Sequence, residues 1–529
     1  MPTIKESSYP VLPSEVGNNL AEGPKVFYAV FAVCTLLHLT LALSSRLYPH
    51  IDLPFHLAAA TIYKYYGSPA NDFSQFFEVN VFLSPNTLFL FFTSLDVFPS
   101  VEAGNKVFYA LYLLLFPVSV LLLIRQLGGN KWYALFSFLL IYNFNVNFGF
   151  VNFYFAIPLV LLLFYFILRS LQTESAWDKA AVAGLLLLIY FTHALATIFA
   201  LIIFGVIYGF CYRRSLKKLA LAGLMVLPTL GLLTYWWSSS QSEADTVGFL
   251  IDYYRQEYLS GFKNRVAFFS MDNFYLFSGK WGWIAGAFFT FLMHLPLAWW
   301  VLAHYKSLPQ QGQWKRNGAL YLFILASLGV FFLGPNRLPD EMHYLYQRFS
   351  VFIHVGFILL ASVLVGRQYQ RQVLVLAGVA FLLHFGAYAE RQFSFEKDSA
   401  DFTPGFLPSE VKGKKFAGIL LDVSFRGRSI YEHFPNYQIT WHQGVTASKA
   451  LDFRFNSLRR KPGAGEAIPR YQYQFTSSGG SSANPYAGFA DYIFVRGRVD
   501  EKTSREELGD YHLVRTSGKW SLRERNGAL

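Results

Sequence analysis

Residues 46–67 read RLYPHIDLPFHLAAATIYKYYG and directly follow the first long apolar run of the chain. Asp52 lies between His50 and His56, at the point where that run ends. Residues 53–66 have the spacing of an amphipathic helix, but a helix needs about 20 apolar residues to cross a bilayer. We therefore predict a short interfacial helix with Asp52 at its start, facing a water-filled cleft that the rest of the chain builds or covers.

The composition is that of a membrane protein. Of the 529 residues, 53% are hydrophobic and 15% are charged, whereas soluble domains carry about a quarter charged residues. In a membrane protein the net charge of +12 first indicates basic cytoplasmic loops, and no helix-turn-helix, zinc-finger or RNA-binding signature points to nucleic acid. Cys34 and Cys211 lie within or at the end of apolar runs, so a disulfide framework is not expected.

Apolar segments predict about eleven membrane spans. They are residues 26–44, 103–124, 132–142, 153–168, 180–190, 195–212, 219–236, 283–304, 319–333, 351–365 and 373–388. Every second connection is short and basic, as in residues 213–218 (RRSLKK), which predicts that these connections face the cytoplasm. Residues 85–97 (PNTLFLFFTSLDV) are too short to span and contain Asp96, so we predict a second interfacial helix there.

This topology divides the chain into three parts. Residues 1–24 form a cytoplasmic segment, and residues 25–388 form the membrane domain with outer loops at 46–102 and 237–282. Residues 389–529 are expected to form an extracytoplasmic α/β domain, with strands at 416–423, 492–495, 511–514 and 520–523 and a flexible loop at 477–485 (SSGGSSANP). The fold class is a polytopic α-helical membrane protein with a C-terminal soluble α/β domain. The tail has no Asn-X-Ser/Thr sequon, which favours a bacterial inner membrane.

Acidic and histidine side chains of the first outer loop are the candidates for chemistry. Asp52 precedes Leu-Pro-Phe-His, so an N-cap role explains it locally; a carboxylate at a low-dielectric boundary also suits a general base or a metal ligand. His50 and His56 can complete a divalent metal site with Asp52, but the HxDxxxH spacing is not a specific metal signature, and hydrogen bonding explains both histidines. Asp72 is expected to be a solvated loop charge, and Glu78 is the better supporting acid.

Cationic groups on the outer side matter if the substrate carries a phosphate. Arg348 lies just ahead of a predicted span and can hold a lipid phosphate, because its guanidinium offers two parallel donors and can reach headgroup depth. The position of Arg348 is explained equally well by snorkelling toward the membrane surface without a ligand. Arg337 and His343 in the same short loop, and Arg255 in the large outer loop, are weaker candidates. His193 lies at a break between two apolar runs, where it either faces a cavity or orients the two helices.

The order of these parts resembles the GT-C glycosyltransferases, polytopic enzymes that use a polyprenyl-phosphate sugar or a similar lipid carrier. The likeness lies in a first span, an Asp directly after it, a first outer loop with two interfacial helices, and basic cytoplasmic turns such as RQLGGNK at 125–131. The resemblance implies an inverting transfer in which Asp52 is the general base, a lipid-linked sugar is the co-substrate, and a glycan, lipid or protein is the acceptor. A transporter or channel, and a non-catalytic scaffold whose outer domain binds a partner, are the alternatives.

Overall fold

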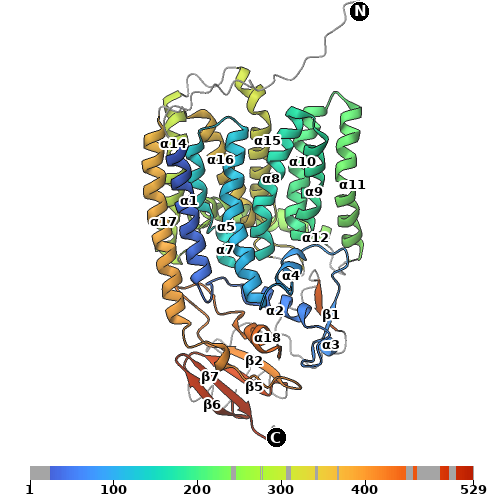
Figure 1. Ribbon diagram of the computed structural model, residues 1–529, viewed down its shortest axis with the longest axis vertical. Coiled ribbons are helices and arrows are strands. Elements are labelled where there is room, and N and C mark those ends of the chain that lie inside the picture. Colours follow the sequence, from blue (N-terminus) through green and yellow to red (C-terminus); the bar gives the residue numbers. More distant parts are fainter. Residues whose placement is uncertain are drawn as a thin grey trace, which may run out of the picture.

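The computed structural model describes residues 24–239, 246–274, 276, 278–304, 311–339, 343–365, 369–447, 457–461, 489–499 and 508–527. The loop expected at 477–485 lies outside these residues. Long helices run roughly parallel through one end of the molecule, and the tail forms a sheet at the other end (Figure 1). The protein is thus a polytopic helical membrane protein with a strand-containing C-terminal region, as the composition predicts.

Eight helices within the described residues are long and apolar enough to cross a membrane. Helices suit this environment because they satisfy their backbone hydrogen bonds internally, where lipid offers no partners. The eight are α1 (Pro24–Ser44), α5 (Val101–Gln126), α8 (Val151–Thr173), α10 (Ala194–Tyr212), α11 (Leu216–Ser239), α14 (Gly279–His304), α16 (Ser350–Leu364, preceded by a 3-10 turn from Tyr346) and α17 (Gln370–Asp398). Two shorter apolar helices, α9 (Ala176–Thr192) and the apolar part of α15 (Gln311–Leu333), complete the bundle.

Two apolar segments form shorter elements than their length predicts. Residues expected to span at 132–142 form a 3-10 turn, Lys131–Phe136, followed by the short α6 (Ser137–Leu140). This segment is buried along almost its whole length against α5, α16 and α17, so tertiary packing stabilises it in place of lipid. In the first outer loop, residues 85–97 contribute only the six-residue α4 (Leu88–Thr93), because Asp96 and the Pro99 turn follow within a few residues.

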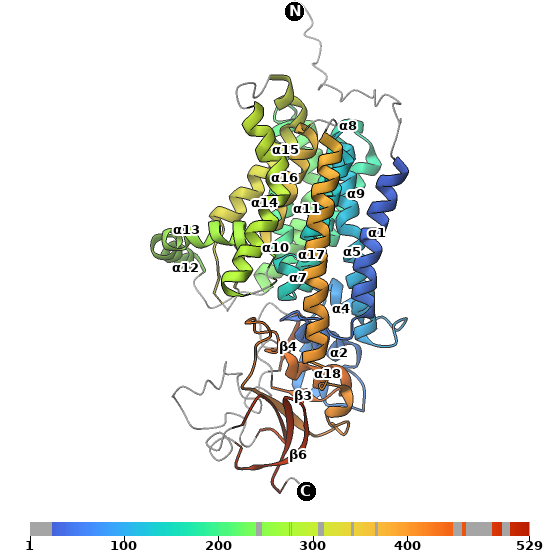
Figure 2. The same cartoon turned by 90° about the vertical axis from the view of Figure 1, so that its left-hand side faces the viewer.

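A layer of short elements lies between the ends of the other long helices and the tail, whereas α17 reaches the tail directly (Figure 1). The layer contains α2 (Leu53–Lys64), α3 (Phe73–Phe76) and α4 from the first outer loop, α7 (Phe144–Phe148) from the bundle and α18 (Tyr437–His442) from the tail. Figure 1 shows α2 and α18 between the ends of the long helices and the sheet, and the two helices are in contact. Beside the bundle, α12 (Thr246–Asp252) and α13 (Tyr258–Ala267) project to one side (Figure 2).

The tail forms a five-stranded mixed sheet in the order β3-β2-β5-β7-β6. Its strands are β2 (Lys415–Leu420), β3 (Val445–Thr446), β5 (Tyr492–Arg496), β6 (Tyr511–Ser517) and β7 (Trp520–Arg525). The β2 and β5 strands are parallel, with Phe416 opposite Tyr492, whereas β7 runs antiparallel to β5 and β6. A second, two-stranded sheet pairs β1 (Phe77–Val79) with β4 (Leu458–Arg460), and thereby joins the first outer loop to the tail.

Candidate functional site

Helix α17 holds the segment that leads to Asp52. Arg391, a buried residue of α17, donates from Nη2 to the carbonyl of Pro49 at 3.2 Å, and Gln392 donates to the carbonyl of Leu47 at 2.6 Å. Arg46 donates in return to the carbonyl of Ser399 at 2.6 Å, just after α17 ends. Because three hydrogen bonds fix the backbone before Asp52, the position of Asp52 is set by α17 and not by α1 alone.

Asp52 occupies the N-cap position of α2, but its side chain makes no capping hydrogen bond. Its backbone N–H instead donates to the carbonyl of Phe148 at 2.9 Å, at the end of α7. Gly149 follows with φ of +91°, and a Cβ at Gly149 would lie 2.8 Å from the backbone nitrogens of Asp52 and Leu53. Glycine is therefore required for this close approach of the α7–α8 turn to Asp52, and the Asp52 carboxylate is left for other partners.

The tail supplies the partner of the Asp52 carboxylate. Nε2 of His433 lies 3.5 Å from Oδ1 of Asp52, and the two side chains are 17% and 22% exposed. Burial opposes protonation of His433, but the hydrogen bond and negative charge of Asp52, together with the charge of Glu432, raise its pKa above 6.5. These effects favour an ion pair between a residue of the first outer loop and a residue 381 positions later in the chain, since 433 minus 52 is 381.

His56 lies one helical turn after Asp52 and borders the same cluster. Burial lowers its pKa to about 4; the Asp52 carboxylate opposes this shift, and the positive charges of His433 and Arg348 reinforce it. Its ring packs against Phe55 and Phe89, which keep it at the edge of the interfacial layer. His56 is thus a neutral imidazole near neutral pH, within electrostatic reach of Asp52, His433 and Arg348.

Arg348, with the imidazole of His193 beside it, forms the cationic side of the cluster. The guanidinium carbon of Arg348 lies 3.7 Å from the ring centroid of Phe150, directly after the Gly149 turn. Its Nη1 lies 3.4 Å from Nε2 of His193, and Nδ1 of His193 accepts from the backbone N–H of Leu195 at 3.1 Å, which caps α10. Asp52 and Arg348 therefore both contact the turn between α7 and α8, and their charges interact.

The other candidates from the sequence lie elsewhere. Nε2 of His50 lies 3.3 Å from the hydroxyl of Tyr388, and the ring stacks on Tyr48 within the bundle. Asp72 is buried and accepts from the backbone N–H of Gly413 at 2.7 Å, so it ties the first outer loop to the tail instead of being solvated. Glu78 lies in β1, opposite Arg459 of β4.

The remaining cationic candidates border the loops beside Arg348. Arg337 pairs with Glu257 at 2.5 Å and lies over the ring of Phe249. His343 contributes its backbone carbonyl, which accepts from Nη2 of Arg348 at 3.4 Å. Arg255 is exposed in the turn between α12 and α13. Within the described part of the chain, Arg348 is therefore the one of these cations whose side chain lies in the Asp52 cluster.

Among the described residues, His50, Asp52 and His56 do not come together as one divalent metal site. Across the described ranges, no three His, Cys, Asp or Glu side chains group closely enough to hold an ion. The HxDxxxH pattern is divided, because His50 turns into the bundle toward Tyr388 while Asp52 faces the tail.

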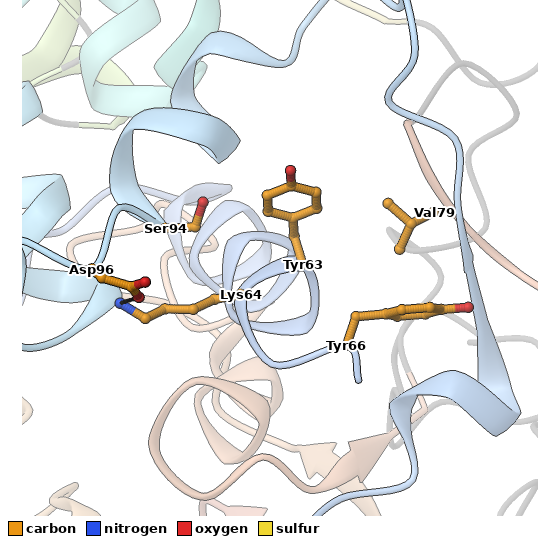
Figure 3. A pocket seen from close by; sticks show the side chains of 6 residues that line it. All are labelled: Tyr63, Lys64, Tyr66, Val79, Ser94 and Asp96. Atoms are coloured by element: carbon orange, nitrogen blue, oxygen red, sulfur yellow. Dashed lines mark ion pairs between the residues drawn. The ribbon is translucent and has the colours of Figure 1, made fainter. Parts of the chain in front are cut away.

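An open cleft of about 400 Å³ lies at the far end of α2. In Figure 3, Tyr63 stands at its centre, with Ser94 and Asp96 on one side and Tyr66 and Val79 on the other. Lys64 closes one edge through an ion pair with Asp96 at 3.5 Å. The twelve residues of α2 separate this cleft from Asp52 by about 18 Å at 1.5 Å per residue, so the cleft and the charged cluster are two separate regions of one surface.

Together these features define a class of protein, a polytopic membrane protein whose helices end in an acid–imidazole–guanidinium cluster beneath a strand-containing tail. No family model and no curated protein matches the sequence. The fold is similar to that of ArnT from Cupriavidus metallidurans, whose crystal structure is bound to undecaprenyl phosphate. The match has a TM-score of 0.55 and 12% sequence identity, and it covers 95% of this chain and 98% of ArnT.

Proposed function

We propose that this protein is a membrane glycosyltransferase that moves a sugar from a lipid-phosphate carrier to an acceptor hydroxyl. The observation that carries the proposal is the convergence of one carboxylate, Asp52, with two cationic or polar N–H donors, Arg348 and His193, at one end of the bundle. The likeness of the fold to ArnT, which binds undecaprenyl phosphate, supports a polyprenyl-phosphate sugar as the donor.

The tautomer of His193 supports an anion-binding role for this pair. Because Nδ1 accepts from Leu195, the proton of the neutral ring is assigned to Nε2. Nε2 of His193 and Nη1 of Arg348, which are 3.4 Å apart, then both carry hydrogens. Two donors cannot form a hydrogen bond with each other. A phosphate oxygen placed between them would accept from both, and the positive end of the α10 dipole would add to the attraction.

These placements support the following reaction. Asp52 accepts the proton of the acceptor hydroxyl as its oxygen attacks the anomeric carbon of the donor. The new carbon–oxygen bond forms as the bond between that carbon and the phosphate oxygen breaks, and the lipid phosphate leaves with the electron pair. Arg348 and His193 stabilise the charge that develops on this leaving group, so no strong general acid is needed.

The basic connections support an extracytoplasmic location for the site. Residues 125–131, 169–179 and 213–218 connect helices at the end of the bundle away from the sheet (Figure 1). Under the positive-inside rule that end faces the cytoplasm. The cluster at Asp52 and the tail then lie on the opposite side of the membrane, where a lipid-linked sugar would meet its acceptor.

The test uses full-length protein in lipid nanodiscs, a panel of undecaprenyl-phosphate sugars and a crude envelope extract as acceptor. We expect wild-type protein to release undecaprenyl phosphate from one of these donors. Asp52→Asn should lose about 10²- to 10⁴-fold in rate, the usual contribution of a general base. The control Asp72→Asn alters an acid of the same loop and should stay near the wild-type rate. Full activity of Asp52→Asn, or no turnover of any donor by the wild type, contradicts the proposal.

A further inference from the structure

His433 belongs to a segment of the tail that hydrogen bonds and ion pairs hold in place. Two residues earlier, the Tyr431 hydroxyl donates to Oδ2 of Asp398 at 2.6 Å, at the end of α17. Arg496, a fully buried residue of β5, pairs with Asp398 at 2.8 Å and with Asp422 at 2.6 Å, and its guanidinium carbon lies 3.6 Å from the ring centroid of Tyr431. A buried charge needs such partners, so this network fixes the segment that presents His433.

Close packing on the other side of the same segment adds to this rigidity. Phe434 and Pro435 are buried, and a Cβ at Gly418 of β2 would lie 2.4 Å from the Pro435 ring. The turn therefore sits directly on the sheet. The 3-10 turn Phe434–Asn436 also contacts α2, the helix that Asp52 begins.

Helix α17 is the common support of both members of the pair. It holds the Asp52 segment through Arg391 and Gln392, and it holds the His433 segment through Asp398. Two residues far apart in sequence thus face one another because the same helix positions both. A histidine that only filled space would not need the buried ion pairs of Arg496 to hold its segment opposite a carboxylate.

We propose that His433 is a positioning residue for Asp52, so that the C-terminal tail forms part of the catalytic site. Nε2 of His433 lies 3.5 Å from Oδ1; its N–H would donate to that oxygen, orient the carboxylate and leave Oδ2 for the acceptor hydroxyl. A separation of 3.5 Å suits this role, because such contacts are often long in a ligand-free site and shorten when substrate binds. This inference rests on the proposed function, since it assigns Asp52 the role of base.

The test compares kcat and KM for the lipid-linked donor across matched variants. His433→Ala should lower kcat about ten- to a hundredfold, the scale expected when a catalytic group loses its orientation, with the donor KM unchanged. His433→Gln keeps an N–H donor and should recover most of that loss. His442→Gln alters a histidine of the tail that pairs with the carbonyl of Pro404 and not with Asp52, and it should behave as wild type.

A double variant distinguishes this inference from the proposed function. If His433 acts through Asp52, Asp52→Asn combined with His433→Ala should be no slower than Asp52→Asn alone. A wild-type kcat for His433→Ala, with Asp52→Asn inactive, overturns the role of His433 and leaves the transferase standing. Full activity of Asp52→Asn overturns the proposed function itself.

A spectroscopic measurement tests the contact without relying on turnover. NMR of ring-labelled histidine in the full chain, with the His433 signal assigned through His433→Gln, gives the pKa of this imidazole. Asp52→Asn should lower that pKa, because Asp52 raises it more than Glu432 does. An unchanged pKa would show that the two side chains do not meet and would refute the inference, even if His433→Ala failed to fold.

Discussion

Replacement of Gly149 by alanine tests how Asp52 is positioned. Gly149 has φ of +91°, and an added Cβ would lie 2.8 Å from the backbone nitrogens of Asp52 and Leu53. Both atoms belong to backbone, so the clash cannot be relieved by a rotamer change. The turn must move away from α2, and the hydrogen bond from the Asp52 N–H to the carbonyl of Phe148 is lost.

The expected cost has two parts. A non-glycine residue in the left-handed region costs roughly 1–2 kcal/mol, and the lost backbone hydrogen bond costs about 1 kcal/mol. The free energy of unfolding should therefore fall by about 2–3 kcal/mol. Activity should fall about a hundredfold, since a displacement of about 1 Å at a catalytic group has that effect.

Gly128 provides the matched control. Its φ is +70°, but a Cβ there would meet no atom within 4 Å. Gly128→Ala should therefore show only the conformational cost of roughly 1–2 kcal/mol, with normal turnover. Denaturant unfolding in detergent and donor turnover measure both quantities. Equal stability and equal activity of the two variants would refute the claim that the α7–α8 turn positions Asp52.

Three further predictions concern the same surface. Arg348→Ala should weaken undecaprenyl-phosphate binding about ten- to a hundredfold by calorimetry, because hydrogen bonds to charged groups contribute about 1.5–3 kcal/mol. Burial opposes protonation of His433, but Asp52 and Glu432 raise its pKa above 6.5. The contribution of the Asp52–His433 pair to the free energy of unfolding should therefore be fully present below pH 6.5 and be lost as pH rises through the folded-state pKa. Tyr63→Ala should raise the acceptor KM and leave the donor KM unchanged, if the cleft at the end of α2 holds an extended acceptor.

Each of these predictions has its own control. Arg337→Ala should leave lipid binding unchanged, because Arg337 pairs with Glu257; an equal loss in both variants would mean that Arg348 acts only through net charge. For the pH prediction, unfolding of His433→Gln provides the reference, since His56 has a pKa of about 4 and stays neutral in this window; a pH-independent difference would contradict it. Tyr65 does not line the cleft, and an equal acceptor KM effect from Tyr65→Ala would exclude the cleft.

Much of the membrane fold could be predicted from the sequence, because apolar length and basic connections are local signals. The helix after Asp52 and the strands β2, β5, β6 and β7 were visible in the same way, through their periodicity. Residues 131–140 were not, because a fully buried apolar segment has the same composition as a lipid-facing one. Only tertiary packing distinguishes the two.

The site was predictable only in part. Asp52 stands out because it directly follows an apolar run, and Arg348 because it directly precedes one. Nothing in the sequence joins either residue to His433, since that contact depends on how α17 supports the tail. Gly149 and Arg391 were missed for the same reason: the close approach and the buried hydrogen bond exist only after the bundle has assembled.

A cryo-electron microscopy structure of the full-length protein with undecaprenyl phosphate would test the central claim most directly. We expect a phosphate between the guanidinium of Arg348 and the imidazole of His193. A phosphate bound at the opposite end of the bundle, near residues 213–218, or no lipid density beside Arg348 at saturating lipid, would contradict this placement.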